Sequence, residues 1–436
     1  MSGRAQRYDR GATGLAFALR MSAKTDTRAA AEAAVRQSYG RLVAYLAARS
    51  RDVAGAEDAL AEAFAAALEQ WPRTGVPANP DAWLLSVARR RQIDAGRRQQ
   101  TAAGAREHLA MIDDERNQAG SNDDVPDERL RLMFTCAHPA IDPMVRAPLM
   151  LQTVLGFDAA SIAAAFLVPA ATMGQRLVRA KGRIKEAGIP FRVPERADLP
   201  DRLDAVLSAI YAAFTAGWAQ TDAAGDRRQG LAGEAIWLGR LMTSLMPREP
   251  ETLGLLALML YADARSAARR DAEGNYIPLS DQQTDLWNTT LINEAETLLR
   301  EASSFGETGR YQLEAAVQSA HCARRHTGAT DWAAIKKLYD VLALLSPSPV
   351  VALNRAVAIA ETDGPIAGLA ALDAIATDKR LETYQPYWAA RADLLARLDR
   401  AGDAIEAYDR AIWLESDAAV RMFLKDRQSR IARQLH

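Results

Sequence analysis

The sequence predicts an all-α fold. Alanine and leucine dominate the chain, β-branched runs are scarce, and apolar residues recur at helical spacing almost throughout. The length of 436 residues suits two to four domains. Hydrophobic residues make up 49% and charged residues 25%, which is the balance of a globular chain with an ample core.

Whole-chain composition excludes several classes of protein. The net charge of −1 argues against a chain that binds polyanions over its entire surface, so the distribution of charge matters more. Two cysteines, Cys136 and Cys322, rule out a disulfide framework and a four-cysteine zinc site, and they fit a reducing cytoplasm. No apolar run approaches the length of a membrane span.

No sequence motif indicates an enzyme, a metal site or a cofactor site. The five histidines form no H-E-x-x-H motif, and no P-loop or G-x-G-x-x-G is present. The closest candidate, Cys136 with His138, lies at an apolar helix end beside Pro139. We interpret it as a packed thiol and a capping histidine rather than a nucleophile or metal pair.

Residues 1–28 are predicted to be a disordered tail, in which Met21 is an alternative start, and residues 29–98 form the first domain. Two amphipathic helices are expected within residues 29–70. The outer face of the second is acidic, through Glu57, Asp58 and Glu62. Acidic residues in a first turn suit the helix dipole, and a docking surface for a basic partner is the functional alternative.

A proline-rich loop is expected from Trp71 to Trp83, with Asp81 as a possible cap of the next helix. That helix begins with Trp83 and carries an exposed basic face. The basic residues are Arg89, Arg90, Arg91, Arg97 and Arg98. Arginines that hold phosphates and an aromatic that stacks on a base would bind a nucleic-acid strand. The alternative is a solvated basic face with Trp83 in the core.

A flexible linker is predicted at residues 99–126, followed by a helical domain at 127–188 that ends in a helix-turn-helix. Pro169 breaks the pattern, and a second helix starts at Ala170. Its predicted inner face is Met173, Leu177, Ala180 and Ile184. Its outward residues are Gln175, Arg176, Arg179, Lys181 and Arg183. An ordinary helical hairpin with a basic face is the alternative.

The second half of the chain is predicted to contain further helices, a helical extension at 189–300 and helical repeats at 301–436. Helices are expected at 201–218, 230–246 and 250–266, the last apolar nearly all round and therefore buried. Helical pairs follow at 311–325 with 331–345, 350–361 with 364–376, and 384–398 with 402–414. The last pair resembles a tetratricopeptide repeat at Trp388, Ala392, Leu395, Ala404, Tyr408 and Ala411.

Three segments, in this order, resemble an extracytoplasmic-function RNA polymerase sigma factor: Gly55–Phe64, Asn79–Arg98 and Val168–Gly188. The whole chain is similar to the subgroup with a tetratricopeptide-like C-terminal extension. The resemblance implies core-polymerase binding by Glu57, Asp58, Glu62 and Phe64. It implies −10 DNA binding by Trp83, Arg90, Arg91, Arg97 and Arg98. It implies −35 DNA binding by Thr172, Gln175, Arg176, Arg179 and Lys181.

The same resemblance implies the partners: core polymerase through its β′ clamp and β flap, promoter DNA, and a peptide or protein ligand for the repeats. It implies no cofactor, no membrane contact and a cytoplasmic location. The chain departs from the family at three places. Ala61 replaces a frequent glutamine, Arg90 a common asparagine, and Phe214–Trp218 reads F-T-A-G-W instead of F-N-E-G-Y.

Two other classes remain open at this point. A conventional regulator with a helix-turn-helix and a helical sensor would leave the acidic helix and the tryptophan–arginine helix unexplained. A pure scaffold would use its basic helices only as solvated surface. Within the sigma-factor interpretation, residues 200–436 either buttress the second DNA-binding domain or mask it, and we expect the buttress.

Overall fold

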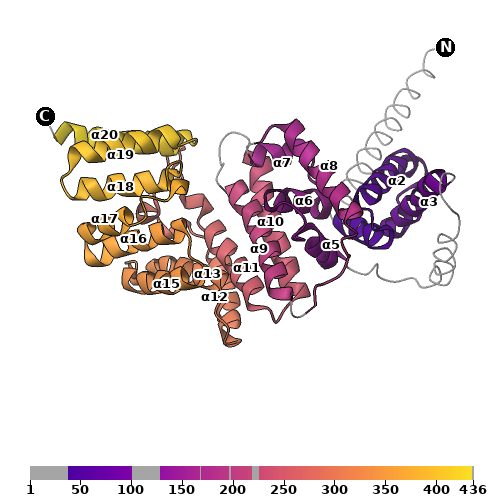
Figure 1. Cartoon of the computed structure of the whole chain (residues 1–436), viewed down its shortest axis with the longest axis horizontal. Helices are drawn as coiled ribbons and strands as arrows, with labels where there is room; N and C mark the ends of the chain where they lie inside the picture. The colour runs from indigo at the N-terminus through magenta and orange to yellow at the C-terminus, as the bar shows by residue number, and fades with distance from the viewer. Residues whose placement is uncertain (1–37, 101–127, 167, 196–197, 219–224, 435–436) are drawn as a thin grey trace, which may run out of the picture. The chain divides into compact units, whose positions relative to one another are not determined.

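The predicted all-α fold is confirmed by the computed structural model of the chain, which describes residues 38–100, 128–166, 168–195, 198–218 and 225–434 (Figure 1). Within these ranges the regular elements are all helices, and a single β-bridge joins Arg270 to Tyr276. The chain divides into two compact units, residues 1–216 and 217–436. The predicted N-terminal tail and nearly all of the predicted linker lie outside the described residues.

Residues 38–100 form the N-terminal module, a set of three helices. Residues 38–50 are helical, followed by α2 (Val53–Thr74) and α3 (Pro80–Gln100). The side chain of Asp52 caps α2 by accepting a hydrogen bond from the Gly55 N–H at 3.0 Å. The core of the module is made of apolar side chains. They include Leu42, Val43, Leu46, Ala56, Leu60, Ala63, Ala67, Trp71, Leu84 and Ala88.

Three expectations for this module are wrong. Helix α2 continues past Pro72, because Trp71 is buried and the chain turns only at Gly75, whose positive φ ends the helix. The spacing of the second amphipathic helix predicts an apolar face of Ala56, Leu60, Ala63, Phe64, Ala67 and Leu68, but Leu68 is 50% exposed. The cap before α3 is Asn79, whose side chain accepts from the Ala82 N–H at 3.0 Å, while Asp81 pairs with Arg41.

Residues 128–188 form the second module, built from four helices. They are α5 (Arg129–Cys136), α6 (Pro143–Leu155), α7 (Ala159–Ala165) and α8 (Ala170–Glu186). Asp158 caps α7 through the Ala160 and Ser161 N–H groups, and α8 starts at Ala170 as predicted. The buried residues of α8 are Met173, Leu177, Ala180 and Ile184, which confirms the whole predicted inner face.

Helix α9 (Leu199–Trp218) follows a short connector and is tied to the second module. Arg202 donates to the Phe134 carbonyl oxygen at 2.6 Å, and Thr135 donates to the Pro190 carbonyl oxygen at 3.4 Å. Ile189 in the connector is buried. The beginning of the long C-terminal part is therefore held against α5 rather than hanging from a free tether.

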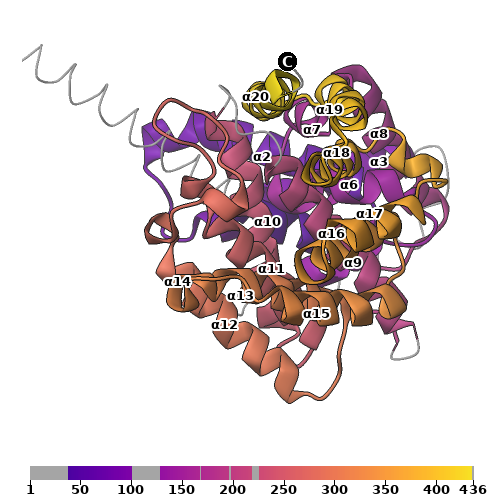
Figure 2. The same ribbon diagram turned by 90° about the vertical axis from the view of Figure 1, so that its left-hand side faces the viewer.

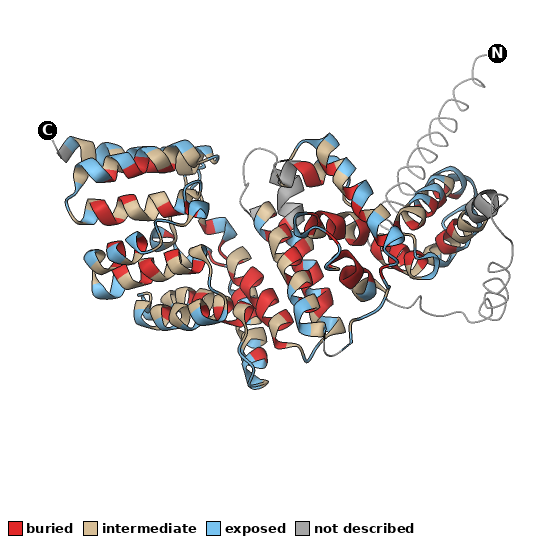
Figure 3. Cartoon of the chain, viewed as in Figure 1, coloured by how far each residue is buried: buried red, intermediate tan, exposed pale blue. Residues whose placement is uncertain are grey.

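The second unit begins with α10 (Gly225–Leu245), α11 (Pro250–Asp263) and α12 (Thr289–Ser304). Eleven of the 14 residues of α11 are buried, and they lie between Pro250 and Tyr261. The prediction of a buried helix is therefore confirmed (Figure 3). Three 3-10 helices lie between α11 and α12: Ser266–Ala268, Leu279–Asp281 and Thr284–Leu286. Helix α12 was missed by the sequence analysis, since its buried residues are only Ile292, Ala295 and Ala302.

Packed helices continue to the end of the described chain. They are α13 (Arg310–Cys322), α14 (Arg324–Thr327), α15 (Trp332–Leu345), α16 (Pro349–Asp363), α17 (Pro365–Asp373), a 3-10 helix (Lys379–Leu381), α18 (Gln385–Arg397), α19 (Ala401–Leu414) and α20 (Ala418–Gln434). Helices α18 and α19 lie side by side in both views (Figure 1, Figure 2). Helix α20 was not predicted.

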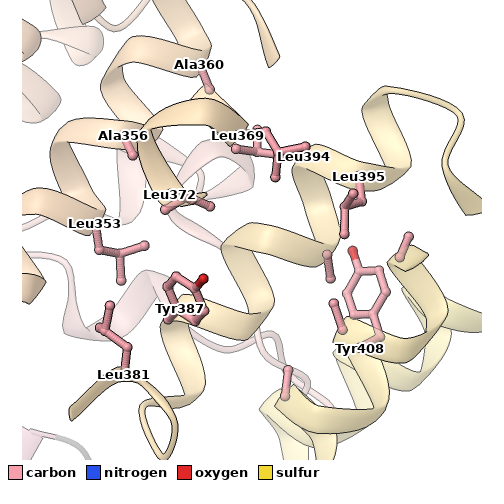
Figure 4. Close-up of a cluster of buried hydrophobic side chains, with 14 of the residues drawn as sticks. Leu353, Ala356, Ala360, Leu369, Leu372, Leu381, Tyr387, Leu394, Leu395 and Tyr408 are labelled. Carbon is pink, nitrogen blue, oxygen red and sulfur yellow. The ribbon is translucent and has the colours of Figure 1, made fainter. Parts of the chain in front are cut away.

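The core of α16–α19 is a cluster of leucines, alanines and two tyrosines (Figure 4). Tyr408 is 2% exposed, and Ala392, Ala404 and Ala411 are fully buried, so small residues bring the helices close while the tyrosine ring fills the space. The packing positions predicted for the last helical pair are buried, with Trp388 partly so. At Gly368 a Cβ would come within 2.4 Å of the Ala360 Cβ, which shows how closely α16 and α17 approach.

Candidate nucleic-acid and protein interfaces

The predicted acidic surface on α2 is only partly exposed. Asp58 and Glu62 are exposed and Phe64 is half-buried. Glu57, expected on the same outer face, has a side chain only 12% exposed. The Asp58 carboxylate is therefore available to a basic partner, whereas Glu62, although exposed, pairs with Arg91 and Glu57 with Lys181.

On α3 the predicted aromatic, Trp83, is half-buried rather than fully in the core or fully exposed. Its ring packs edge-on against Trp71, with ring centroids 5.6 Å apart at an angle of 64°. Both interpretations of Trp83 are thus partly met: one side of the ring contributes to packing and the rest is accessible. Arg90 is exposed, whereas the side chains of Arg97 and Arg98 lie outside the described part.

Two further arginines of α3 interact within the N-terminal module. Arg89 donates to the Tyr45 hydroxyl, and its guanidinium carbon lies 5.0 Å from the centre of the Tyr45 ring. Arg49 lies 4.8 Å from the same ring, so Tyr45 contacts two cations. Arg91 pairs with Glu62 at 3.1 Å, and both side chains remain about half exposed. One predicted −10 residue, Arg91, is therefore in contact with one predicted core-binding residue, Glu62.

Helix α8 displays most of its predicted reading residues. Gln175 and Arg179 are exposed, and Thr172 and Arg176 are half-buried. The buried stripe fixes the rotation of α8, so these side chains point away from the core of the second module. The basic character of the last turn, from Arg183 and Lys185, suits the negative end of the helix dipole.

Lys181 differs from its prediction, because its side chain is turned inward and is only 11% exposed. Its Nζ lies 2.5 Å from Glu57 Oε2 on α2 of the N-terminal module. Lys185 makes a second bridge, 2.6 Å from Asp52 Oδ2. The sequence analysis missed both pairs, since nothing in local periodicity reports a contact between residues more than a hundred positions apart. It also missed the contact between Tyr45 and Arg89, which lie on different helices.

The electrostatics of the two pairs differ. Burial raises the pKa of the Glu57 carboxyl, although Lys181 acts in the opposite direction. Burial also acts on Asp52, but hydrogen bonds from the Gly55 N–H and from Lys185 outweigh it and lower the pKa of that carboxyl. Asp52 is thus well satisfied as a carboxylate, and Glu57 is not: its Oε1 atom is buried without a hydrogen-bond partner among the described residues.

The candidates set aside as catalytic or metal-binding are packed groups. Burial raises the pKa of the Cys136 thiol to about 12, and its Sγ lies 3.4 Å from Thr153 Oγ1. His138 Nδ1 accepts from the Ala140 N–H at 3.1 Å, as expected for a capping histidine. Burial lowers the pKa of His321 to about 4, and its ring packs on Trp332. Across the described ranges, no group of three or more His, Cys, Asp or Glu side chains could hold a metal ion.

The second unit carries a groove of about 770 Å³ along α18 and α19. Trp388, Arg391, Arg410 and Trp413 are among its lining residues. Trp413 is 72% exposed, with the Arg410 guanidinium 4.8 Å from its ring centre. Exposed tryptophan and arginine side chains are enriched in protein-binding surfaces, so the composition of this groove is typical of such a surface.

Comparison with known proteins gives two family matches. Sigma-70 region 2 matches residues 34–102, which include both α2 and α3. A family of unknown function, DUF6596, matches residues 202–303. No solved structure matches the chain. In the part of the chain that the structure describes, no helix has the length and hydrophobicity needed to span a membrane.

Three curated relatives extend these matches. The chain is 40% identical over 394 residues to "Uncharacterized protein R00370" of Rhizobium meliloti (strain 1021), covering 89% of this chain and 92% of the relative. It is 34% identical over 172 residues to the ECF RNA polymerase sigma factor SigC of Mycobacterium tuberculosis (strain CDC 1551 / Oshkosh), covering 38% of this chain and 86% of the relative. The "Probable RNA polymerase sigma-C factor" of Mycobacterium bovis (strain ATCC BAA-935 / AF2122/97) matches to the same extent.

Proposed function

The chain belongs to the RNA polymerase sigma factor family, and we propose that it directs promoter-specific initiation through −10 and −35 recognition, with its C-terminal helices supporting that activity. The match of Sigma-70 region 2 to residues 34–102 carries the proposal, because it covers the acidic helix and the tryptophan–arginine helix together. A conventional regulator or a scaffold explains neither. The chain acts in this proposal as a cytoplasmic, non-enzymatic transcription factor.

Core polymerase binds the acidic surface of α2 in this proposal. Asp58 and Glu62 supply exposed carboxylates, and the half-buried Phe64 supplies an aromatic contact. Complementary charge steers association and penalises wrong partners. Glu57 joins this surface once Lys181 is displaced. The β′ clamp is the proposed contact for α2, and the β flap a further contact of the sigma factor.

Promoter DNA binds two separate helices. The −10 strand is proposed to lie along α3, where Trp83 presents part of its ring and Arg90 is exposed, with Arg91, Arg97 and Arg98 along the same helix. Helix α8 is proposed to enter the major groove of the −35 element, where Gln175, Arg176 and Arg179 would contact the edges of the bases. Thr172 and Lys181 complete the proposed −35 set.

The C-terminal part is proposed to buttress the second module. The bond from Arg202 of α9 to the Phe134 carbonyl of α5 supports this, because it holds the start of α9 against the second module, and the connector residue Ile189 is buried. The helical pairs from α15 onward are proposed to form a tetratricopeptide-like array whose groove binds a peptide or protein. Truncation near Arg196 should lower transcription in vivo and leave core binding largely intact.

A point substitution tests the buttress in the full chain. Arg202→Ala removes a charged donor to a backbone carbonyl, an interaction worth about 1.5–3 kcal/mol. It should reduce −35-dependent transcription, whereas Arg240→Ala, which breaks an exposed ion pair with Glu294, should not. A truncated chain more active than the full one would support a mask, and unchanged activity of the truncated chain would exclude both roles.

Run-off transcription from purified core polymerase, followed by mapping of start sites, tests the proposed function as a whole. We expect the chain to confer initiation at defined positions preceded by common −10 and −35 sequences. DNA binding without any core-dependent initiation would show a conventional regulator instead. Absence of both core binding and salt-sensitive DNA binding would leave the scaffold.

A further inference from the structure

Three arginines gather in the second unit, where α11 packs against α13 and α14 follows α13 (Figure 2). We call Arg265, Arg324 and Arg325 the arginine cluster. Arg265 lies just after α11 and is only 8% exposed, and the other two begin α14. The Arg265 guanidinium donates to the side-chain oxygen of Gln318. Gln318 lies one helical turn before the fully buried Cys322, so both occupy the same face of α13.

The three guanidiniums lie around the Cys322 thiol. Burial raises the pKa of this thiol, while Arg265, Arg325 and Arg324 all act in the opposite direction. Electrostatic interactions weaken with distance, so each of the three cations lies near the same sulfur. Burial outweighs them, and the thiol therefore keeps its proton at neutral pH. Cys322 supplies no negative charge to balance the arginine cluster.

Carboxylates do not balance the arginine cluster either. Within the described ranges, its one ion pair joins Arg325 Nη2 to Glu296 Oε1 at 3.4 Å. Arg324 donates to the backbone carbonyls of Ser280 at 2.6 Å and Gln282 at 2.7 Å, which accept its hydrogens but carry no net charge. Three guanidiniums and one carboxylate leave two positive charges unbalanced.

Several donors of this region also lack acceptors. Nη1 of Arg265, together with Nε and Nη1 of Arg325, is buried without a hydrogen-bond partner among the described residues. The same holds for Nε1 of Trp287, whose ring centre lies 5.2 Å from the Arg324 guanidinium carbon. An arginine side chain keeps its proton in proteins, and a buried charged donor without an acceptor is unfavourable. These atoms are all donors, so the missing partner is an acceptor.

The surroundings of Arg265 are unfavourable to its charge. Burial lowers the pKa of its guanidinium; Cys322 acts against this shift, and the neighbouring cations Arg269 and Arg324 add to it. His321 adds no further charge at neutral pH, because burial lowers its pKa to about 4. An anion beside Arg265 would replace repulsion by attraction.

Bulk water does not explain the arginine cluster, because the Arg325 side chain is only 12% exposed and Arg265 is still less exposed. The same burial limits the size of a ligand. Residues 279–288 are held by Arg324 through two carbonyls of this segment, and Trp287 within it is 4% exposed. A polymer such as DNA cannot reach donors enclosed in this way, whereas a small anion can.

We infer that the arginine cluster binds a small oxyanion of the phosphate or carboxylate class. A guanidinium donates to two oxygens of such an anion at once, and the Trp287 N–H supplies a further donor. The bound anion links the end of α11, through Arg265, to α14, through Arg325. This inference does not depend on the sigma-factor assignment, and the site is distinct from the groove along α18 and α19.

Isothermal titration of the full chain with inorganic phosphate tests this inference directly. The titration is made at neutral pH in a chloride buffer of constant ionic strength, and acetate is used as a second probe. We expect saturable binding at one site per chain. Binding of phosphate indicates a phosphate-type ligand, and binding of acetate alone indicates a carboxylate. Failure of both probes to bind would overturn the inference.

Two variants locate the binding on the chain. Arg265→Met and Arg325→Met keep a long side chain but remove the charge, so each should weaken binding at least about tenfold. Arg380→Met, at an arginine that is 72% exposed and paired with Asp378, should bind like the wild type. Circular dichroism checks the fold, and if one variant loses helicity the other decides. Unchanged affinity would overturn the site, because phosphate would then bind elsewhere.

The two native cysteines give an independent readout of position. Cys322 borders the arginine cluster, and Cys136 is buried in the other unit. Their modification by N-ethylmaleimide is followed separately by peptide mass spectrometry. Phosphate at ten times its dissociation constant should slow the modification of Cys322 about elevenfold and leave Cys136 unaffected. Equal slowing at both cysteines would indicate general stabilisation by salt and would contradict the site, as would no slowing at Cys322.

Discussion

Helices α8 and α3 are both basic, and both are proposed to bind DNA, but the chain holds them in different ways. Helix α8 is anchored by four buried residues on one side, and its reading residues Gln175 and Arg179 are exposed on another. Helix α3 uses residues of its basic, proposed DNA-binding face for its own support: Trp83 packs on Trp71, Arg89 on Tyr45, and Arg91 pairs with Glu62. Apart from Lys181, which pairs with Glu57, the residues proposed to bind DNA are separate from the packing residues on α8, whereas on α3 several of them also make packing contacts.

The largest expected effect comes from the buried stripe of α8. Leu177 is 1% exposed, so Leu177→Ala should destabilise the first unit by about 2–5 kcal/mol. Val178→Ala, at a neighbouring side chain that is 68% exposed, should change the unfolding free energy by less than about 0.5 kcal/mol. Denaturant unfolding followed by circular dichroism measures the unfolding free energy of both variants. Equal losses of stability would contradict the assignment of Leu177 to the buried face of α8 and Val178 to its exposed face.

The variant Trp83→Ala tests whether a residue of α3 serves both folding and DNA binding. We expect a loss of about 1–3 kcal/mol in open-complex formation from lost base stacking, together with a lower melting temperature from the lost contact with Trp71. Permanganate footprinting on a duplex promoter and on a pre-melted bubble separates the two effects. Loss of stability with normal footprinting would make Trp83 a structural residue alone.

Arg176→Ala should act on α8 without a comparable loss of stability. An arginine that pairs bidentately with guanine contributes about 1–3 kcal/mol of discrimination, so preference should relax at one or two positions of the −35 element. Lys185→Ala is expected to change the salt dependence of binding instead. Equal losses on every promoter variant for Arg176→Ala would demote this residue to a phosphate contact.

The cap of α7 provides the smallest and most pH-sensitive effect. The Ser161 hydroxyl and backbone N–H groups lower the pKa of Asp158 below its usual value of 3.8. A lowered pKa stabilises the folded state above pH 3.8, and this contribution disappears as the pH falls through the folded-state pKa. Asp158→Ala should cost about 1 kcal/mol at neutral pH and little in strong acid, whereas Asp158→Asn should retain most of the cap at both.

Local patterns in the sequence were sufficient where burial alone decides the structure. The stripe Met173, Leu177, Ala180 and Ile184 and the buried helix α11 follow directly from helical periodicity and composition. The same reasoning missed α12, whose apolar face is sparse. It also ended the helix α2 at Gln70, before Pro72, although Gly75 is the residue that turns the chain.

Contacts between distant segments were not predictable in this way. Lys181 has the spacing of an outward residue, and only the three-dimensional approach of α2 turns it inward to Glu57. The contact between Tyr45 and Arg89 depends in the same way on a neighbour that no local pattern specifies.

Binding of the Asp58→Lys variant to purified core polymerase tests the sigma-factor assignment most directly. Asp58 is exposed on the acidic surface of α2, and reversing its charge should weaken assembly by several kcal/mol if that surface meets a basic partner. Glu69→Lys makes the same charge change at an exposed position farther along α2 and should bind core like the wild type. Wild-type affinity for Asp58→Lys would show that polymerase does not bind this surface.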